Sequence, residues 1–144
     1  MFGCSSKTYS IDKKIMNIKS ISFDAVEKKL EFGENVPNNL IKIAETWFNK
    51  KVKVNGYNGK VTIIIDDYIN QISDINEGKR VDNSLNFEIK INKSDLLTKK
   101  NIIGNIKTYG TLTGSFTLNE LDLLIYNTQV DLIVLLSEEL NKNF

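Results

Sequence analysis

The sequence lacks several residues on which protein chemistry commonly depends. It has no histidine in 144 residues, which removes the commonest general base, the commonest transition-metal ligand and the usual pH switch. Its one cysteine, Cys4, has no partner in the chain for a disulfide or a thiolate metal site. No run of about eighteen apolar residues is present to cross a membrane as a helix. We therefore expect no metal or other cofactor.

The rest of the composition is that of an ordinary folded domain. Hydrophobic residues make up 41% of the chain and charged residues 26%, with a single proline. Nineteen basic residues against eighteen acidic ones give a net charge of +1, which argues against a nucleic-acid partner. At this length, one domain can bury a hydrophobic core without disulfides.

The N-terminal segment resembles a lipid-attachment site. Residues 1–6 are Met-Phe-Gly-Cys-Ser-Ser, and a cysteine between a glycine and two serines is what remains of a bacterial lipobox when its signal peptide is missing. We interpret residues 1–17 as a lipobox remnant and flexible tether, with a diacylglycerol thioether on Cys4. Several acyl chains anchor a protein durably, since each buried CH₂ contributes about 0.8 kcal/mol. In this interpretation Met1 is either a replacement start codon or a start placed inside the signal. The alternative is a stray cysteine in a flexible terminus.

Apolar periodicity divides residues 18–144 into strands and helices. Alternation predicts strands at residues 18–26, 61–72, 85–91 and 102–112, and helical spacing predicts helices at residues 37–50 and from 118 onward. Thr117 with Glu120 three residues later has the form of a capping box. Three strands joined by polar turns pair antiparallel. The fold class is therefore α+β, a two-layer sandwich of order β-α-β-β-β-α with two helices on one face.

Two groups of charged residues are candidate sites. Four lysines follow the first predicted helix: Lys50, Lys51, Lys53 and Lys60. They are candidates for contact with anionic lipid headgroups or lipopolysaccharide phosphates, although solvated lysine turns are the plainer interpretation.

The second group is Asp66-Asp67, the only adjacent acidic pair within a predicted strand. Neighbours on a strand point to opposite faces, so the two carboxylates are poorly placed to share a proton or a metal ion. A polar interruption of the strand is the favoured interpretation. With no histidine as base and no catalytic motif, we expect the protein not to be an enzyme.

Several stretches resemble a family of short, largely uncharacterised alphaproteobacterial lipoproteins. The matching segments are residues 44–47 (AETW), 61–67 (VTIIIDD), 81–89 (VDNSLNFEI), 117–120 (TLNE) and 135–140 (LLSEEL). The resemblance covers residues 37–142 and departs at Val81-Asp82, where the family tends to have Tyr-Asp. It carries over no functional residue. The same element order is similar to that of the outer-membrane lipopolysaccharide-assembly lipoprotein and of auxiliary lipoproteins of envelope lipid transport, which implies an envelope role.

Three functions remain open from the sequence. The favoured one is a lipoprotein of the cell envelope, on the inner leaflet of the outer membrane facing the periplasm, that binds an envelope protein or lipopolysaccharide. A small-ligand carrier is the second, and it predicts a cavity behind Trp47, Phe87 and Ile106. A soluble enzyme is the third, and it predicts a deep pocket that collects Asp66 and Asp67.

Overall fold

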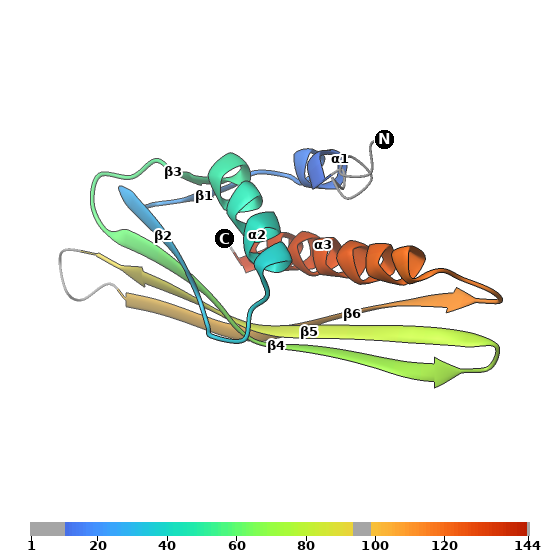
Figure 1. Ribbon diagram of the computed structural model, residues 1–144. Helices are drawn as coiled ribbons and strands as arrows, with labels where there is room; N and C mark the ends of the chain where they lie inside the picture. Colours follow the sequence, from blue (N-terminus) through green and yellow to red (C-terminus); the bar gives the residue numbers. More distant parts are fainter. Residues whose placement is uncertain (1–10, 94–98, 144) are drawn as a thin grey trace.

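A long twisted sheet carries the helices on one of its faces (Figure 1). The computed structural model describes residues 11–93 and 99–143. The helices are α1 (Ile11–Met16), α2 (Asn38–Lys51) and α3 (Leu118–Asn143). The strands are β1 (Ile21–Phe23), β2 (Glu27–Phe32), β3 (Val52–Val54), β4 (Lys60–Ile75), β5 (Gly78–Asn92) and β6 (Lys99–Thr113).

The main sheet has the strand order β2-β4-β5-β6. β4, β5 and β6 form the predicted antiparallel meander, whereas β2 pairs with β4 in parallel. α2 and α3 lie on the same side of this sheet, and α1 lies farther out, beyond α3 (Figure 1). The predicted α+β class with helices covering one face is confirmed.

The first predicted strand, residues 18–26, is divided in the structure. Its first part, β1, leaves the main sheet and pairs in parallel with β3, Ile21 facing Val52. The second part is β2. The division follows from a tight turn at Asp24, where the Ala25 N–H donates to the Phe23 carbonyl at 2.9 Å. α1 precedes both strands and lies within the range assigned to a tether, with Ile15 fully buried.

The meander strands are longer than predicted. Residues 73–80 lie in the polar turn expected between the predicted strands at 61–72 and 85–91, yet they continue the β4–β5 ladder up to the pair Ile75–Gly78. The turn between them places Glu77 at a positive φ of 60°. The polar side chains misled the prediction because backbone pairing at the end of a hairpin does not require an apolar face.

A β-bulge in β4 reverses which residues face the helices. Asp66 pairs with Asn86 but Ile69 pairs with Ser84, so two residues of β4 lie opposite one of β5. Asp67 adopts a positive φ of 50° there. Before the bulge the odd-numbered residues of β4 are buried; after it Ile69 is 58% exposed. Unbroken alternation through the predicted strand at residues 61–72 would place Ile69 on the same face as Val61, Ile63 and Ile65, and the bulge makes that placement wrong.

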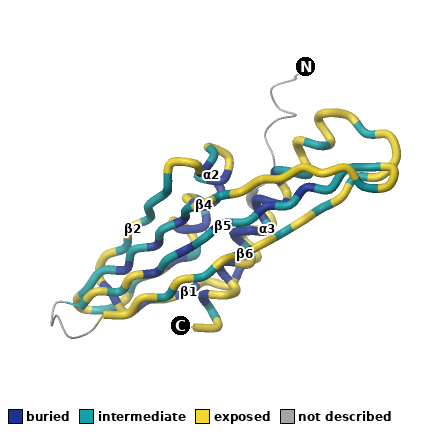
Figure 2. Tube along the Cα trace, turned by 90° about the horizontal axis from the view of Figure 1, so that it is seen from below, coloured by how far each residue is buried: buried dark blue, intermediate teal, exposed yellow. Residues whose placement is uncertain are grey.

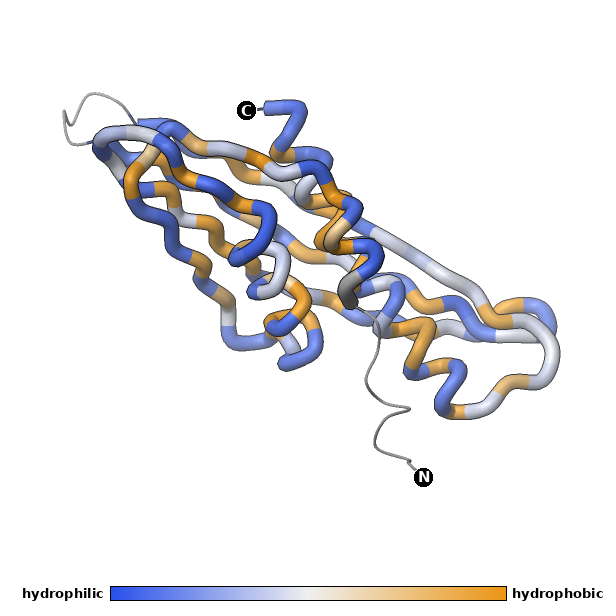
Figure 3. Tube along the Cα trace, turned by 90° about the horizontal axis from the view of Figure 1, so that it is seen from above, coloured by the Kyte–Doolittle hydropathy of each residue, from blue (hydrophilic) through white to orange (hydrophobic). Residues whose placement is uncertain are grey.

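The hydrophobic core lies between the sheet and the two longer helices. α2 buries the five residues whose helical spacing predicts this helix: Leu40, Ile43, Ala44, Trp47 and Phe48. α3 contributes Leu132, Leu136 and Leu140. Buried positions follow the strands beneath the helices (Figure 2), and apolar residues alternate with polar ones along them (Figure 3). The predicted capping box opens α3, with the Glu120 N–H 3.1 Å from the Thr117 hydroxyl oxygen and the Thr117 N–H 3.1 Å from the Glu120 carboxylate.

Candidate functional site

The predicted lipidation residue, Cys4, lies outside the described residues, which begin with α1. α1 is held to the rest of the domain by the buried side chain of Ile15 and by an ion pair between Lys14 Nζ and Asp131 Oδ1 at 2.9 Å. None of the helices in the described part of the chain has the length and apolar character needed to span a membrane.

The four predicted lipid-contact lysines lie where α2 ends, in β3 and at the start of β4. Lys50 and Lys51 close α2, and Lys53 lies in β3. Lys60 pairs with Glu27 of β2. It faces away from the helices, because the next residue of β4, Val61, is buried beneath them and neighbours on a strand point to opposite faces. The four lysines thus share one end of the molecule but occupy both faces of the sheet.

A fifth lysine at this end, Lys28, was not predicted from the sequence. Its Nζ donates to the carbonyl oxygens of Phe48 at 2.9 Å and Val52 at 2.8 Å, and lies 4.6 Å from the centre of the Phe48 ring. An ammonium group in this position satisfies free carbonyls at the end of α2 and complements the helix dipole. Desolvation, with a smaller contribution from Lys53, lowers the pKa of Lys28 below its usual 10.5. Only its alternation with Leu30 and Phe32 in the sequence signalled that it faces inward.

The acidic pair Asp66-Asp67 lies where the bulge begins and makes local hydrogen bonds. The backbone N–H of Asp67 donates to Asp66 Oδ1 at 2.7 Å, and Asn86 Nδ2 donates to Asp67 Oδ2 at 2.9 Å. Aspartate is one of the few residues that enters the left-handed region readily. The predicted polar interruption of the strand is therefore a structural device that redirects the residues following it.

The most elaborate polar arrangement lies between α3 and the sheet, just past the bulge. We call it the polar layer, and it consists of Tyr68, Asn70, Asn83, Thr108, Thr128 and Gln129. Asn83 Oδ1 accepts from Tyr68 Oη at 2.8 Å and from Asn70 Nδ2 at 2.6 Å. Asn83 Nδ2 donates to the Thr128 hydroxyl. Gln129 Nε2 donates to Tyr68 Oη at 3.0 Å, and Thr108 Oγ1 donates to the Thr128 carbonyl at 2.8 Å.

Burial makes this layer energetically important. Asn83, Thr128 and Gln129 are all nearly fully buried, and Gln129 Oε1 has no hydrogen-bond partner in the described structure. Burial also raises the pKa of Tyr68 above 10.0, and this effect exceeds the opposite effect of the hydrogen bonds with Gln129 and Asn70, which lower the pKa. The polar layer was not predicted, because it depends on the bulge that turns Tyr68 inward.

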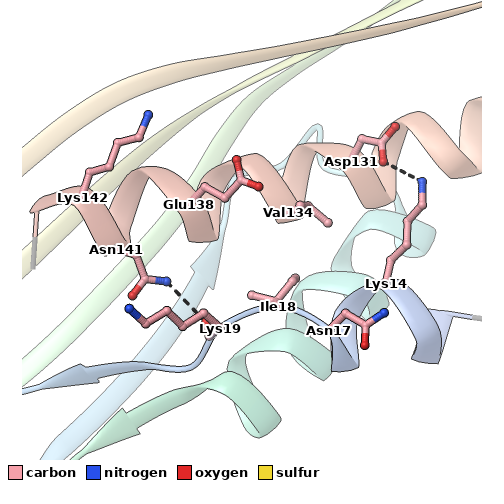
Figure 4. A pocket seen from close by; sticks show the side chains of 9 residues that line it. All are labelled: Lys14, Asn17, Ile18, Lys19, Asp131, Val134, Glu138, Asn141 and Lys142. Atoms are coloured by element: carbon pink, nitrogen blue, oxygen red, sulfur yellow. Dashed lines mark hydrogen bonds and ion pairs between the residues drawn. The ribbon is translucent and has the colours of Figure 1, made fainter.

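A groove of about 640 Å³ separates α3 from α1 and the residues after it (Figure 4). Its lining comprises Lys14, Asn17, Ile18, Lys19, Asp131, Val134, Glu138, Asn141 and Lys142. Ile18 and Val134 supply its apolar surface, and charges of both signs surround them. The Lys14–Asp131 ion pair bridges it near one end, and a hydrogen bond from Asn141 Nδ2 to the Lys19 carbonyl at 3.3 Å bridges it near the other.

The structure also bears on the cavity expected of a carrier. Trp47 and Phe87 are buried in the core, and Ile106 is 7% exposed. The large groove lies on the side of α3 that faces α1, and its lining includes none of these three residues. In the described part of the chain, no group of three or more acidic or cysteine side chains is placed to hold a metal ion.

Two solved structures of bacterial lipoproteins are similar to this chain in fold. A minor lipoprotein from Acinetobacter baumannii matches with a TM-score of 0.57 and 14% identity, over 81% of this chain and 93% of that one. Rare lipoprotein B from Shewanella oneidensis matches with a TM-score of 0.54 and 12% identity, over 83% of this chain and all of that one. The chain shares the fold of these two lipoproteins.

The similarity in fold to envelope lipoproteins that the sequence predicts is thereby confirmed. It extends over nearly the whole of both neighbours, so the shared feature is a complete domain rather than a single motif. At this level of identity the likeness concerns the fold alone. No protein-family model matches the sequence, and no curated protein matches it.

Proposed function

We propose that this protein is a bacterial envelope lipoprotein, anchored through acylated Cys4, whose α+β domain is a binding or assembly module. The observation that supports it best is the fold shared with two lipoproteins, in a chain with a lipobox-like Gly-Cys-Ser-Ser ahead of its first helix. In this proposal the protein lies on the periplasmic face of the outer membrane, serves lipid or lipopolysaccharide transport, and catalyses no reaction.

Mass spectrometry of the mature N-terminus tests the anchor. The gene, with its upstream codons restored, is expressed in a Gram-negative host beside a Cys4→Ser control. We expect acylated cysteine at the new N-terminus of the natural sequence and release of the control from the membrane fraction. An unmodified N-terminus that begins at Met1 would remove the lipoprotein proposal.

We further propose that the lysine-rich end contacts anionic lipid. Near an anionic membrane each lysine contributes about 1 kcal/mol, and this contribution weakens as salt shortens the screening length. The lysines involved are Lys50, Lys51, Lys53 and Lys60, and α2 and β3 bring the first three together on the helix side of the sheet.

Sedimentation with anionic vesicles tests this contact. Replacing the four lysines by glutamine is expected to reduce binding at low salt by more than tenfold, since about 4 kcal/mol of attraction is lost. A matched variant changes four lysines of other surfaces to glutamine: Lys13, Lys79, Lys107 and Lys142. Equal losses in both variants would show that net charge alone, and not this end of the molecule, attracts the vesicles.

A further inference from the structure

The free edge of β6 is the longest unpaired strand edge in the described structure. β6 is the last strand of the order β2-β4-β5-β6, and its fifteen residues pair with β5 on one side only. At about 3.3 Å per residue this edge is about 50 Å long. It borders the sheet in the view from below (Figure 2). An edge of this length is a template for a further strand unless something covers or disrupts it.

Two large apolar side chains project from β6 on the face away from the helices. Ile103 is 72% exposed and Tyr109 is 63% exposed. Ile103 pairs with Glu88 of β5 and Tyr109 with Asp82, and both β5 residues point away from the core. The Arg80 guanidinium lies 4.2 Å from the centre of the Tyr109 ring, on the β5 side of that ring. Ile103 and Tyr109 are placed symmetrically about Ile106.

A small groove marks the same midpoint on the helix side of the strand. It has a volume of about 260 Å³ and separates β6 from α3. Asn105, Ile106 and Lys107 form its β6 wall, and Leu135 and Glu139 belong to its α3 wall. Leu135 interrupts the buried stripe of α3 and is 38% exposed. Exposed apolar side chains therefore lie on both sides of the sheet near the centre of the free edge: Leu135 on the helix side, and Ile103 and Tyr109 on the side away from the helices.

We propose that a second copy of this chain adds to this edge, β6 against β6 in antiparallel orientation, with a two-fold axis at Ile106. The two sheets then form one continuous sheet of eight strands, and both α3 helices lie on the same face. The axis passes beside the small groove, so each Leu135 is carried toward the groove of the other copy.

The side chains select this register. The two-fold axis is normal to the sheet, so a residue that points away from the helices in one copy faces a residue that also points away from them in the other. In β6 these residues are odd-numbered, and the numbers of two facing residues therefore add up to an even number. With the axis at Ile106, Ile103 of each copy faces Tyr109 of the other, an aromatic and β-branched pair of the kind that stabilises sheets. Asn105 then faces Lys107.

The neighbouring registers are poorer. Moving the axis one residue forward places Lys107 against its own copy, which opposes like charges. Moving it one residue back places Ile103 against Lys107 and separates it from Tyr109. Only the register centred on Ile106 pairs both exposed apolar residues and opposes no two lysines.

Sedimentation equilibrium on the full chain tests the dimer, with Cys4→Ser in every variant to prevent disulfide dimers. We expect a monomer–dimer equilibrium that I103K/Y109K shifts toward monomer by about tenfold or more in dissociation constant. The matched control is Ile69→Lys, which changes a residue of similar exposure on the same face of β4, away from the edge. The control should leave the dissociation constant unchanged.

Cysteine cross-linking tests the register independently of the lysine variants. I103C/Y109C should form a covalent dimer under mild oxidation, whereas either single cysteine should not. A bridge within one copy is excluded, because six residues of a strand span about 20 Å and a disulfide joins Cα atoms less than about 7 Å apart.

Three outcomes would overturn the proposal. They are a monomer at every concentration, a dimer that I103K/Y109K leaves intact, and cross-linking by a single cysteine. A monomer that binds an extended peptide of another protein at β6 would assign the edge to a different partner. Because every variant lacks Cys4, the result does not depend on the lipid anchor.

Discussion

Replacing Asn83 by alanine should destabilise the domain more than any other single polar truncation in the sheet. Asn83 is 1% exposed and makes three side-chain hydrogen bonds in the polar layer, two as acceptor and one as donor. It joins β4 to α3, two elements that are distant in sequence. The alanine variant leaves its partners in place but removes the group that they share.

The magnitude follows from what each partner retains. Tyr68 Oη loses its acceptor but keeps the hydrogen bond that it accepts from Gln129 at 3.0 Å. Thr128 Oγ1 loses a donor but still donates to the Ile125 carbonyl at 2.7 Å. Asn70 is exposed, so water replaces its lost acceptor. Two groups of the polar layer are thus partly orphaned at about 1–3 kcal/mol each, and we expect a total loss of about 2–6 kcal/mol.

Urea unfolding of the natural chain and the Asn83→Ala variant measures this loss. Asn92→Ala is the matched control, because Asn92 lies at the end of the same strand and is exposed to solvent, and its change should stay within about 0.5 kcal/mol. A double-mutant cycle with Tyr68→Phe should give a coupling energy of about 1 kcal/mol. A loss below about 1 kcal/mol in Asn83→Ala, or no coupling to Tyr68, would refute the energetic role assigned to the polar layer.

Three further predictions concern single residues. Thr117→Ala removes the capping oxygen of α3 and should cost about 1 kcal/mol in unfolding free energy, whereas Thr117→Ser should restore most of it. The raised pKa of Tyr68 means that the folded state holds the phenolic proton more tightly, so the natural chain should lose stability as the pH rises above 10.0. Tyr68→Phe should lack that loss in unfolding curves taken across this range. The lowered pKa of Lys28 means that the unfolded state binds more protons just below pH 10.5, so stability should rise with pH there. Lys28→Met should lack this rise, and an equal slope in both proteins would contradict the assignment.

Local patterns predicted the elements whose faces are set by their own sequence. The stripe from Leu40 to Phe48 specified both α2 and its buried side, because helical spacing and burial agree there. The capping box at Thr117 specified the start of α3 for the same reason. The central parts of the three meander strands followed from strict alternation. These elements include most of the hydrophobic core.

What the sequence did not predict depends on contacts between distant segments. The bulge at Asp67 reverses the alternation of β4, and period-two reasoning continues through it unchanged. No burial was predicted for Asn83 or Gln129, because nothing local distinguishes a buried amide from an exposed one. The position of Lys28 depends on the end of α2, which lies twenty residues later in the chain. The candidate site lies largely in these non-local features, so it was predicted less well than the fold.

The order of elements at the N-terminal end also determines how the domain would respond to mechanical force. A load applied through the N-terminus reaches α1 first, and α1 is held by the Ile15 side chain and the Lys14–Asp131 ion pair. Next come the three residue pairs between β1 and β3, and only then the six between β2 and β4. Tension would therefore detach the short peripheral elements in sequence before it strains the meander. The segment from α1 to β2 would act as an extensible connection in series with the core of the domain.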